Sequence, residues 1–212
     1  MKKRISSIFC LLAFAITSMQ AKDYNVKDYG AIGDGKTLDH IAINATIDTC
    51  VAHGGGRVVL PAGTYLCGSI RMKSNVELHL MTGSKILAAP ASMKAYDEAE
   101  EFEGTAYQDG GHTYFKNSLI YAIGANDVSI TGRGMIDGEG LTRRDTEKGG
   151  NLHGGNIGTG DKAIAFKQCR NILIRDVTIY RGGHFGIIVT GCELGTIDNV
   201  IVDTNRDGID ID

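Results

Sequence analysis

Apolar and polar residues alternate in short segments in the second half of the chain, and the pattern repeats after 23 residues. Aligning residues 163–184 with residues 186–207 brings six apolar or cysteine positions together without a gap: Ile164 with Ile187, Phe166 with Val189, Cys169 with Cys192, Ile174 with Ile197, Val177 with Val200 and Ile179 with Val202. The segment 118–137 fits the same template less closely, and the segment 76–80 resembles an earlier copy.

This repeat predicts a coil of parallel strands with one turn per repeat. A unit of about 20–25 residues cannot bury its apolar side chains alone, so it must stack on its neighbours. Equivalent residues then form ladders inside the coil, with turns about 4.8 Å apart, and Cys169 lies against Cys192. An antiparallel sandwich or barrel also uses short strands, but it predicts no fixed period. We therefore predict an all-β parallel solenoid.

One helix is expected over residues 38–53, with Thr37 as its N-cap, Ile41, Ile47 and Cys50 toward one side, and glycines 54–56 ending it. This helix is expected to cover the open end of the coil, where unpaired backbone groups would invite aggregation. The polar stretch 89–117 is expected to be an insertion, with a short helical piece at about 91–102.

Composition agrees with many short strands joined by tight turns. Glycine makes up 29 of the 212 residues, about twice its usual share of ~7%. The glycines keep no three-residue period and only 2 prolines occur, which excludes collagen. A hydrophobic content of 42% with a net charge of −3 excludes a disordered chain.

Residues 1–21 have the basic, apolar, small-residue order of a secretory signal peptide, and their apolar run of 12 residues is too short to span a bilayer. We expect an exported protein without a membrane span, whose domain begins at residue 22. Residues 1–21 carry three basic and no acidic side chains, so the net charge of −3 becomes −6 without them. An acidic domain without a basic run is a poor nucleic-acid binder.

The four cysteines beyond residue 21 are Cys50, Cys67, Cys169 and Cys192. Their spacing shows neither a CxxC motif nor a zinc-binding pattern. We interpret them as small buried apolar residues.

Two further motifs match known ligand-binding patterns. Residues 30–37 satisfy the Walker A pattern, but the preceding segment is too polar for a buried strand, and a glycine-rich turn is the simpler interpretation. Residues 203–208 fit the opening of an EF-hand calcium loop, but the flanking residues alternate like a strand and not like a helix.

The same C-terminal residues suggest a third interpretation. If Ile209 and Ile211 point into the coil, Asp210 and Asp212 point outward, and Asp207 lies at the turn just before them. Paired carboxylates are what glycoside hydrolysis needs, one as acid and one as base. Solvated acidic residues at a strand end are an equally good explanation of the cluster by itself.

Several segments together resemble the N-terminal part of polygalacturonases, glycoside hydrolase family 28. They are YGAIGDGKT (29–37), GGGRVVLPAGTY (54–65), SNVELHL (74–80), ITGRGMIDG (130–138) and NRDGID (205–210). The first is shared with other right-handed parallel β-helix proteins and so is more typical of the fold than of the activity. The last one is the specific segment.

The resemblance implies a right-handed, single-stranded parallel β-helix with an N-terminal capping helix, of which residues 22–212 form the first half. It also implies an inverting hydrolysis of α-linked galacturonic acid in polygalacturonan or rhamnogalacturonan, with no metal and no other cofactor. Asp207 matches the residue that helps to activate water, and Asn205 and Asp210 match the neighbours that orient it. The expected partner is a galacturonate-containing polysaccharide or oligosaccharide, bound by a monomer.

The resemblance is incomplete at the C-terminal side. The general acid of the family belongs to an Asp-Asp pair about one coil later, followed by Gly-His-Gly and Arg-Ile-Lys segments that bind the substrate carboxylate, and none of these occurs here. We therefore expect this chain to be inactive by itself. Phe185 falls where the family often has an aromatic residue near the cleft, although core packing explains it equally well. His184 is the other candidate for substrate contact, although a surface or turn histidine is its simpler interpretation.

Two other classes remain open. A polysaccharide lyase on the same coil would use calcium and an arginine base, and its unsaturated products would absorb in the ultraviolet. A non-catalytic carbohydrate-binding β-helix would bind glycans and release nothing.

Overall fold

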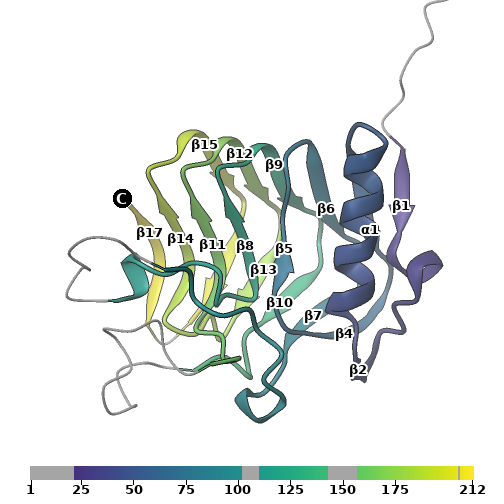
Figure 1. Cartoon of the computed structure of the whole chain (residues 1–212), viewed down its shortest axis with the longest axis horizontal. Helices are drawn as coiled ribbons and strands as arrows, with labels where there is room; N and C mark the ends of the chain where they lie inside the picture. The colour runs from purple at the N-terminus through teal and green to yellow at the C-terminus, as the bar shows by residue number, and fades with distance from the viewer. Residues whose placement is uncertain (1–21, 102–109, 143–156, 205) are drawn as a thin grey trace, which may run out of the picture.

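The computed structural model describes residues 22–101, 110–142, 157–204 and 206–212, which form a stack of parallel strands. Successive turns of the chain add strands to three sheets, and the strands within each sheet pair in parallel. Figure 1 shows the stack from α1 at one end to β17 at the other. The predicted right-handed parallel β-helix is confirmed.

We name the three sheets A, B and C. Along the chain, each coil contributes a strand first to sheet C, then to sheet A and then to sheet B. Sheet A contains β1 (Asp23–Asn25), β3 (Gly56–Leu60), β6 (Val76–Leu80), β9 (Asn126–Thr131), β12 (Arg170–Arg175) and β15 (Glu193–Asp198). Sheet B contains β2 (Asp34–Leu38), β4 (Gly63–Cys67), β7 (Ser84–Ala88), β10 (Met135–Asp137), β13 (Thr178–Tyr180) and β16 (Ile201–Asp203). Sheet C contains β5 (Ile70–Arg71), β8 (Ile120–Ile123), β11 (Lys162–Lys167), β14 (Phe185–Thr190) and β17 (Asp207–Ile211).

Apolar ladders run through the interior of the coil along the stack. In sheet A, one such ladder is formed by Val58, Leu78, Ile130, Ile174 and Ile197. Fully burying one such side chain contributes about 1.5–3 kcal/mol. The 23-residue repeat is confirmed, since the pairs predicted from it lie in register in all three sheets.

The cysteines behave largely as predicted. Cys50, Cys67 and Cys169 are buried and Cys192 is partly buried, and all four are free thiols. The backbone N–H of Cys169 donates to the Sγ of Cys192 at 3.4 Å, so these two residues are neighbours on successive coils.

The turn from sheet A to sheet B requires a left-handed backbone at one position in successive coils. Gly132, Asp176 and Asn199 occupy this position with φ angles of 99°, 67° and 49°. Glycine, asparagine and aspartate adopt this conformation at the lowest cost. This requirement accounts for part of the glycine-rich composition.

The capping helix α1 (His40–Ala52) lies across the first coils. Its position is as predicted, and Ile47 and Cys50 are buried as expected, but its start differs and Ile41 does not face the core. The N-cap is Asp39 and not Thr37, which lies in β2. The side chains facing the core are those of Ile43, Thr46, Ile47 and Cys50, while Ile41 is exposed. None of the helices in the described ranges has the length and hydropathy needed to cross a bilayer.

Asp39 also explains why the glycine-rich segment 30–37 is not a phosphate loop. The carboxylate of Asp39 accepts hydrogen bonds from the backbone N–H groups of Ile32, at 2.7 Å, and Gly33, at 3.0 Å. These donors are therefore already bound by an anion of the protein itself. Residues 30–33 form the predicted glycine-rich turn, while residues 34–37 already belong to β2.

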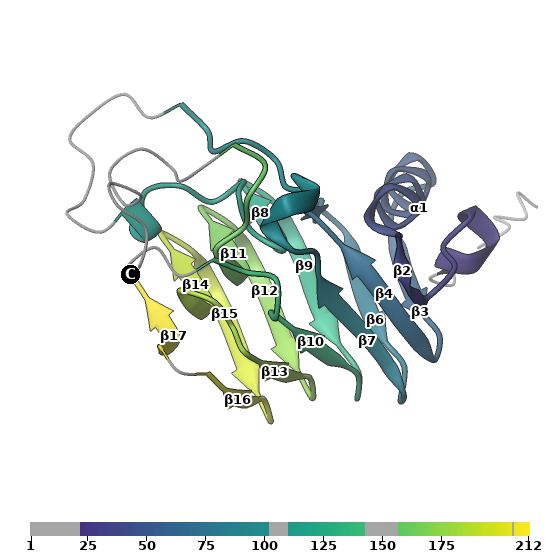
Figure 2. The same cartoon turned by 90° about the horizontal axis from the view of Figure 1, so that it is seen from below.

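The insertion 89–117 lies between β7 and β8, along the side of the stack that carries β8, β11 and β14 (Figure 2). The predicted helix at about 91–102 is wrong. The described residues there form only a 3-10 turn, η2 (Ala91–Met93), and a second 3-10 turn, η3 (Gly110–His112), follows later. The described residues of this segment contact the sheet through polar groups such as Asp97 and through the buried side chains of Tyr96 and Phe115.

Candidate active site

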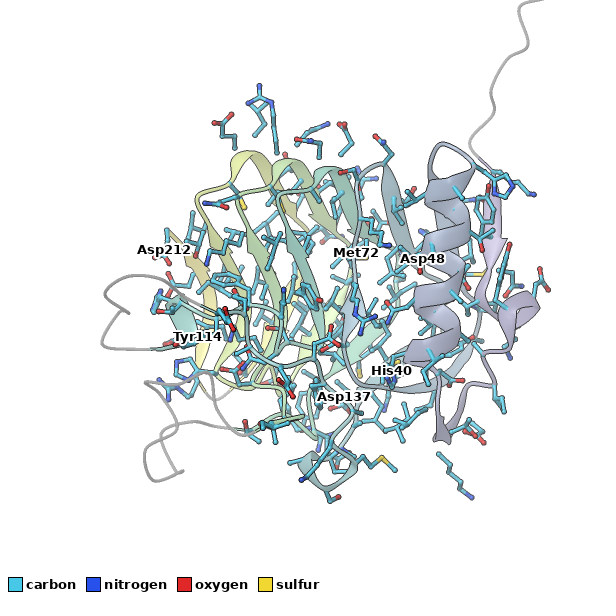
Figure 3. The ribbon with its side chains drawn as sticks, in the orientation of Figure 1. His40, Asp48, Met72, Tyr114, Asp137 and Asp212 are labelled. Atoms are coloured by element: carbon cyan, nitrogen blue, oxygen red, sulfur yellow. The ribbon has the colours of Figure 1, made fainter. Side chains whose placement is uncertain are left out.

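The carboxylates that the sequence singles out lie on β17, at one edge of sheet C. In the register of β17 with β14, Asp207 lies beside Phe185 and Asp210 beside Ile188, while the two isoleucines of β17 continue the interior ladders. The predicted alternation is therefore confirmed, with Asp210 on the outer face. This edge lies at the far end of the stack from α1, as the labelled side chain of Asp212 shows (Figure 3).

Asp207 is the candidate base, and the structure leaves it accessible. Its side chain is 54% exposed, and Nη2 of Arg206 lies 4.0 Å from its Oδ2. A general base must reach both water and substrate, and this exposure allows that. Asn205, the predicted neighbour that supports Asp207, lies outside the described residues. The catalytic roles of Asp207, Asn205 and Asp210 remain predictions.

His112 is a site residue that the sequence did not reveal. It belongs to η3 in the insertion, and its Nδ1 donates to Oδ2 of Asp212 at 2.9 Å. Its Nε2 lies 3.8 Å from Oδ2 of Asp210, and its ring meets the Phe185 ring edge-on with centroids 5.1 Å apart. His112 therefore connects the insertion to the acidic edge strand. His112 and Asp212 are 100 residues apart, and His112 does not belong to the repeat, so no sequence pattern links the two.

Among the described residues, one group has donor atoms close enough together to hold a metal ion. It consists of His112, Asp210 and Asp212. One donor atom from each lies within 4.8 Å of the others. Imidazole nitrogen with two carboxylates is a common set of first ligands for divalent cations. A nearby hydrogen bond from Thr190 Oγ1 to Oδ2 of Asp212, at 3.0 Å, also orients that carboxylate.

Phe185 and His184, the two candidates for substrate contact, are both buried in the structure. Phe185 is buried in a small apolar cluster on the outer face of sheet C, together with Phe115, Tyr121, Ala165 and Ile188. His184 is fully buried, and its ring centroid lies 4.4 Å from that of Phe185. His184 lies in a turn, which is one of the two simpler interpretations given above, but it is buried and not at the surface. Contact of either residue with substrate stays a prediction. Phe115 and His112 of the insertion contact Phe185, so the insertion contributes to its burial.

A buried ion pair lies next to His184, where β11 begins. The Nζ of Lys162 donates to Oδ1 of Asp161 at 2.6 Å, and both side chains are shielded from water. Asn117 also donates to Oδ1 of Asp161, at 3.3 Å, and the backbone N–H of His184 donates to the Asp161 carbonyl at 2.6 Å. Neutralising charges in this way is a condition for burying them. The cluster joins the end of the insertion to two coils of sheet C.

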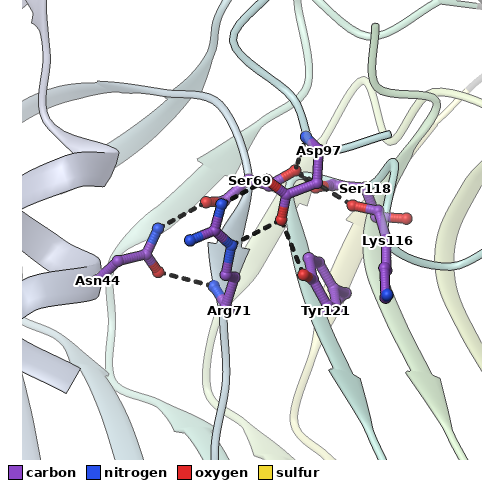
Figure 4. Close-up of polar contacts among 7 residues, drawn as sticks. All are labelled: Asn44, Ser69, Arg71, Asp97, Lys116, Ser118 and Tyr121. Carbon is purple, nitrogen blue, oxygen red and sulfur yellow. Dashed lines mark hydrogen bonds and ion pairs between the residues drawn. The ribbon is translucent and has the colours of Figure 1, made fainter. Parts of the chain in front are cut away.

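A second polar network holds the first part of the insertion, around Asp97 (Figure 4). Arg71 on β5 donates two hydrogen bonds to the carboxylate of Asp97, at 2.7 and 2.6 Å, and the Tyr121 hydroxyl donates to the same carboxylate at 2.8 Å. The backbone N–H of Asp97 donates to Ser69 Oγ at 3.0 Å. Asn44 of α1 bonds to the backbone of Ser69 and Arg71, so that the helix, sheet C and the insertion are tied together.

This network shifts the protonation of its members. Burial disfavours the charged form of Asp97, but the hydrogen bonds from Arg71 and Tyr121 outweigh burial, so the pKa of Asp97 lies below its ordinary value. Hydrogen bonding to Asp97 raises the pKa of Arg71. Burial, followed by the hydrogen bond to Asp97, raises the pKa of Tyr121.

The lowered pKa of Asp97 predicts an acid-dependent part of the stability. Because the folded-state pKa is depressed, Asp97 stabilises the fold above its unfolded-state value of about 3.9, and this contribution is lost as the pH falls through the folded-state pKa. Arg71 is half exposed, so we expect the contribution to be about 1 kcal/mol. In urea unfolding at pH 7 and pH 3, Asp97→Asn should reduce the loss of unfolding free energy between the two pH values by that amount.

Tyr121→Phe is the matched variant, because it keeps the pair between Arg71 and Asp97 and should keep most of the acid dependence. An Asp97→Asn protein with the same acid dependence as the wild type would show that the network contributes nothing to it.

Comparison with known proteins identifies the family. The family model for rhamnogalacturonase A/epimerase, pectate lyase-like proteins matches residues 24–212. The chain belongs to this family. This chain is also similar to an exo-poly-α-D-galacturonosidase from Dickeya chrysanthemi. The resemblance to polygalacturonases that the sequence predicted is thus confirmed. The two are 33% identical over 134 residues, which cover 60% of this chain and 21% of the relative.

Two further similarities concern proteins of different kinds. The structure is similar to that of a hyperthermoactive exopolygalacturonase from Thermotoga maritima, with a TM-score of 0.70 and 27% identity, covering 90% of this pectate lyase-like chain and 50% of that one. The plasmin and fibronectin-binding protein A of Streptococcus pneumoniae is 31% identical over 184 residues, which cover 86% of this chain and 23% of that protein. The chain therefore spans about a fifth of the length of either curated relative.

Proposed function

We propose that this chain is part of an exported hydrolase that cleaves α-linked galacturonic acid polymers, namely polygalacturonan or rhamnogalacturonan, with inversion. Membership of the family and similarity to polygalacturonases support the hydrolase class and a polysaccharide substrate. The observation that carries the proposal is the position of Asp207 and Asp210 on one edge strand of sheet C, where one is exposed and the other faces outward beside the insertion.

In the proposed mechanism, Asp207 removes a proton from the attacking water. Asp210, on the same strand, orients that water together with Asn205. An inverting hydrolysis also needs a protonated carboxyl about 6.5–9.5 Å from the base, so that water fits between base and sugar. The family resemblance assigns this acid to the coil after β17, and we propose that the complete protein supplies it from there.

Export is the second part of the proposal. The basic, apolar and small-residue order of residues 1–21 supports a secretory signal and delivery to the periplasm or the medium. This location suits an enzyme whose polymeric substrate cannot enter the cell. Mass spectrometry of the mature N-terminus tests it, and a mature protein that retains residues 1–21 would contradict it.

The activity is tested with the purified complete protein and polygalacturonate. We expect reducing ends to be released without ultraviolet-absorbing unsaturated products, and at the same rate in the presence of a chelator. Residues 22–212 alone should release nothing, because they lack general acid catalysis, which is worth about 10²–10⁴-fold. Calcium-dependent formation of unsaturated products would show that the protein is a lyase and would reject the hydrolase proposal.

A non-catalytic binding protein is the second candidate. Similarity to the pneumococcal binding protein covers 86% of the chain, a larger share than the 60% covered by similarity to the galacturonosidase. This candidate predicts binding of glycan or protein without product release by the complete protein. The same assay therefore separates the two.

A further inference from the structure

A groove of about 470 Å³ lies on the outer face of sheet A, at the corner where the chain turns toward sheet B. Its walls include side chains from successive coils, among them Arg57, His79, Thr131, Arg133 and Arg175. The candidate active site is on sheet C, so this groove belongs to a different face of the stack.

The register of the strands explains why cations gather on this face. The neighbouring residues Val58, Leu78, Ile130 and Ile174 are buried in the interior ladder. Side chains one position away therefore point outward, and this brings Arg57, His79 and Arg175 to the same side of sheet A. Arg133 follows the turn residue Gly132.

The acidic side chains near the groove are already engaged by neighbours. Glu77 accepts a hydrogen bond from Thr131 Oγ1 at 2.5 Å, and Thr131 Oγ1 lies 2.8 Å from His79 Nδ1. Asp23, beside the groove, binds Arg57 through two hydrogen bonds, at 2.9 and 2.7 Å.

Asp176 is a further carboxylate of the groove, and it accepts a hydrogen bond from Asn199 Nδ2 at 2.7 Å and lies beside Arg175. Arg133 and Arg175 are the arginines of the groove whose guanidinium groups keep exposed donors. Nε of Arg175 lies 3.4 Å from Oδ2 of Asp176, and the guanidinium is about half exposed. Arg133 is exposed and makes no ion pair with another residue in the described ranges. Met81, which is 46% exposed, adds an apolar surface to the same groove.

We propose that this groove is a non-catalytic binding site for an acidic carbohydrate, with Arg133 and Arg175 binding carboxylates of uronic acid units. A guanidinium donates two parallel hydrogen bonds to a carboxylate. Arg133 and Arg175 belong to successive coils, and the strands of successive coils are about 4.8 Å apart. Both arginines are therefore within reach of one oligosaccharide. Met81 packs against the C–H face of a sugar ring. The choice of a uronate rests on the proposed function, while the anionic character of the ligand rests on the groove.

The test is calorimetric titration of the Asp207→Asn protein, which does not consume the ligand, with a hexamer of galacturonic acid. We expect Arg133→Ala combined with Arg175→Ala to weaken binding at this groove by about tenfold or more, since removing one charge-assisted hydrogen bond lowers the affinity by about a factor of ten. A neutral hexamer of galactose should bind equally weakly to both proteins.

Arg170→Ala is the matched control, because Arg170 is an exposed arginine of the same sheet that pairs with Glu193 outside the groove. Hexagalacturonate binding that is unchanged by the double variant, or weakened equally by Arg170→Ala, overturns the proposal. Displacement of the hexamer by millimolar inorganic phosphate as effectively as by free galacturonate would reduce the groove to a general anion site and would also overturn it.

Hydrolysis assays distinguish an error in this proposal from an error in the proposed function. The complete protein with both arginines replaced should keep its turnover of short galacturonate oligomers and lose affinity only for long polymer. Absence of any hydrolysis by the wild type, together with arginine-dependent hexamer binding, would reject the hydrolase and retain the groove.

Discussion

Replacing Asp207 with asparagine in the complete protein should lower the turnover of polygalacturonate by about 10²–10⁴-fold, because the amide cannot accept a proton from water. The side chain is 54% exposed, and its ion-pair contact among the described residues is that with Arg206 at 4.0 Å, so the fold should be unaffected. Initial rates of reducing-sugar release, measured with saturating substrate, give the effect on kcat. The urea midpoint of the same protein checks its stability.

The matched control is Asp203→Asn. Asp203 is an exposed aspartate close in sequence to Asp207, but it lies on β16 in sheet B, at the end of the preceding coil. It should leave the rate within about twofold of the wild type, as expected for a surface residue to which no catalytic role is assigned. Equal rates in the Asp207 and Asp203 variants would remove Asp207 from the mechanism.

Breaking the buried pair between Asp161 and Lys162 should have the largest effect on stability. Asp161→Ala leaves the Lys162 ammonium in a site without access to water, and removing one partner of such a pair costs about 3–5 kcal/mol. Urea unfolding followed by circular dichroism measures this loss. Because the pair joins the end of the insertion to sheet C, chymotrypsin cleavage within the insertion should also become faster.

Asp23→Ala provides the comparison, because it breaks an exposed pair with Arg57 that has the same bidentate geometry as many surface ion pairs. It should cost no more than about 1 kcal/mol. Combining Asp161→Leu with Lys162→Met should recover part of the stability, since both charges of this pair are then removed together. If Asp161→Ala is no more destabilising than Asp23→Ala, the buried pair has no special role.

Some features of the site followed from local pattern. The outward direction of Asp210 was predictable because alternation along a strand is a property of the backbone and needs no knowledge of neighbours. The stacking of Ile164 on Ile187 was predictable because a repeat of constant length allows one register.

Other features depended on segments that do not belong to the repeat. His184 was expected in a turn or at the surface, and it lies in a turn, but packing against Phe185 and contact with Asp161 leave it buried. The N-cap position shifted from Thr37 to Asp39 because β2 extends to Leu38, and that extension depends on pairing with β4. His112 showed no periodic signal and met Asp212 only through the path of the insertion.

The sequence by itself determined the coil, its period, the identity of its interior ladders and the strand that carries Asp207 and Asp210. These follow from periodicity, which short-range backbone geometry converts directly into structure. Only the tertiary structure decided which part of sheet C is covered, that His112 lies beside the acidic edge strand, and that arginines of successive coils share a groove on sheet A. Such contacts join residues far apart in the chain, and their formation depends on packing and charge in three dimensions that no local pattern records.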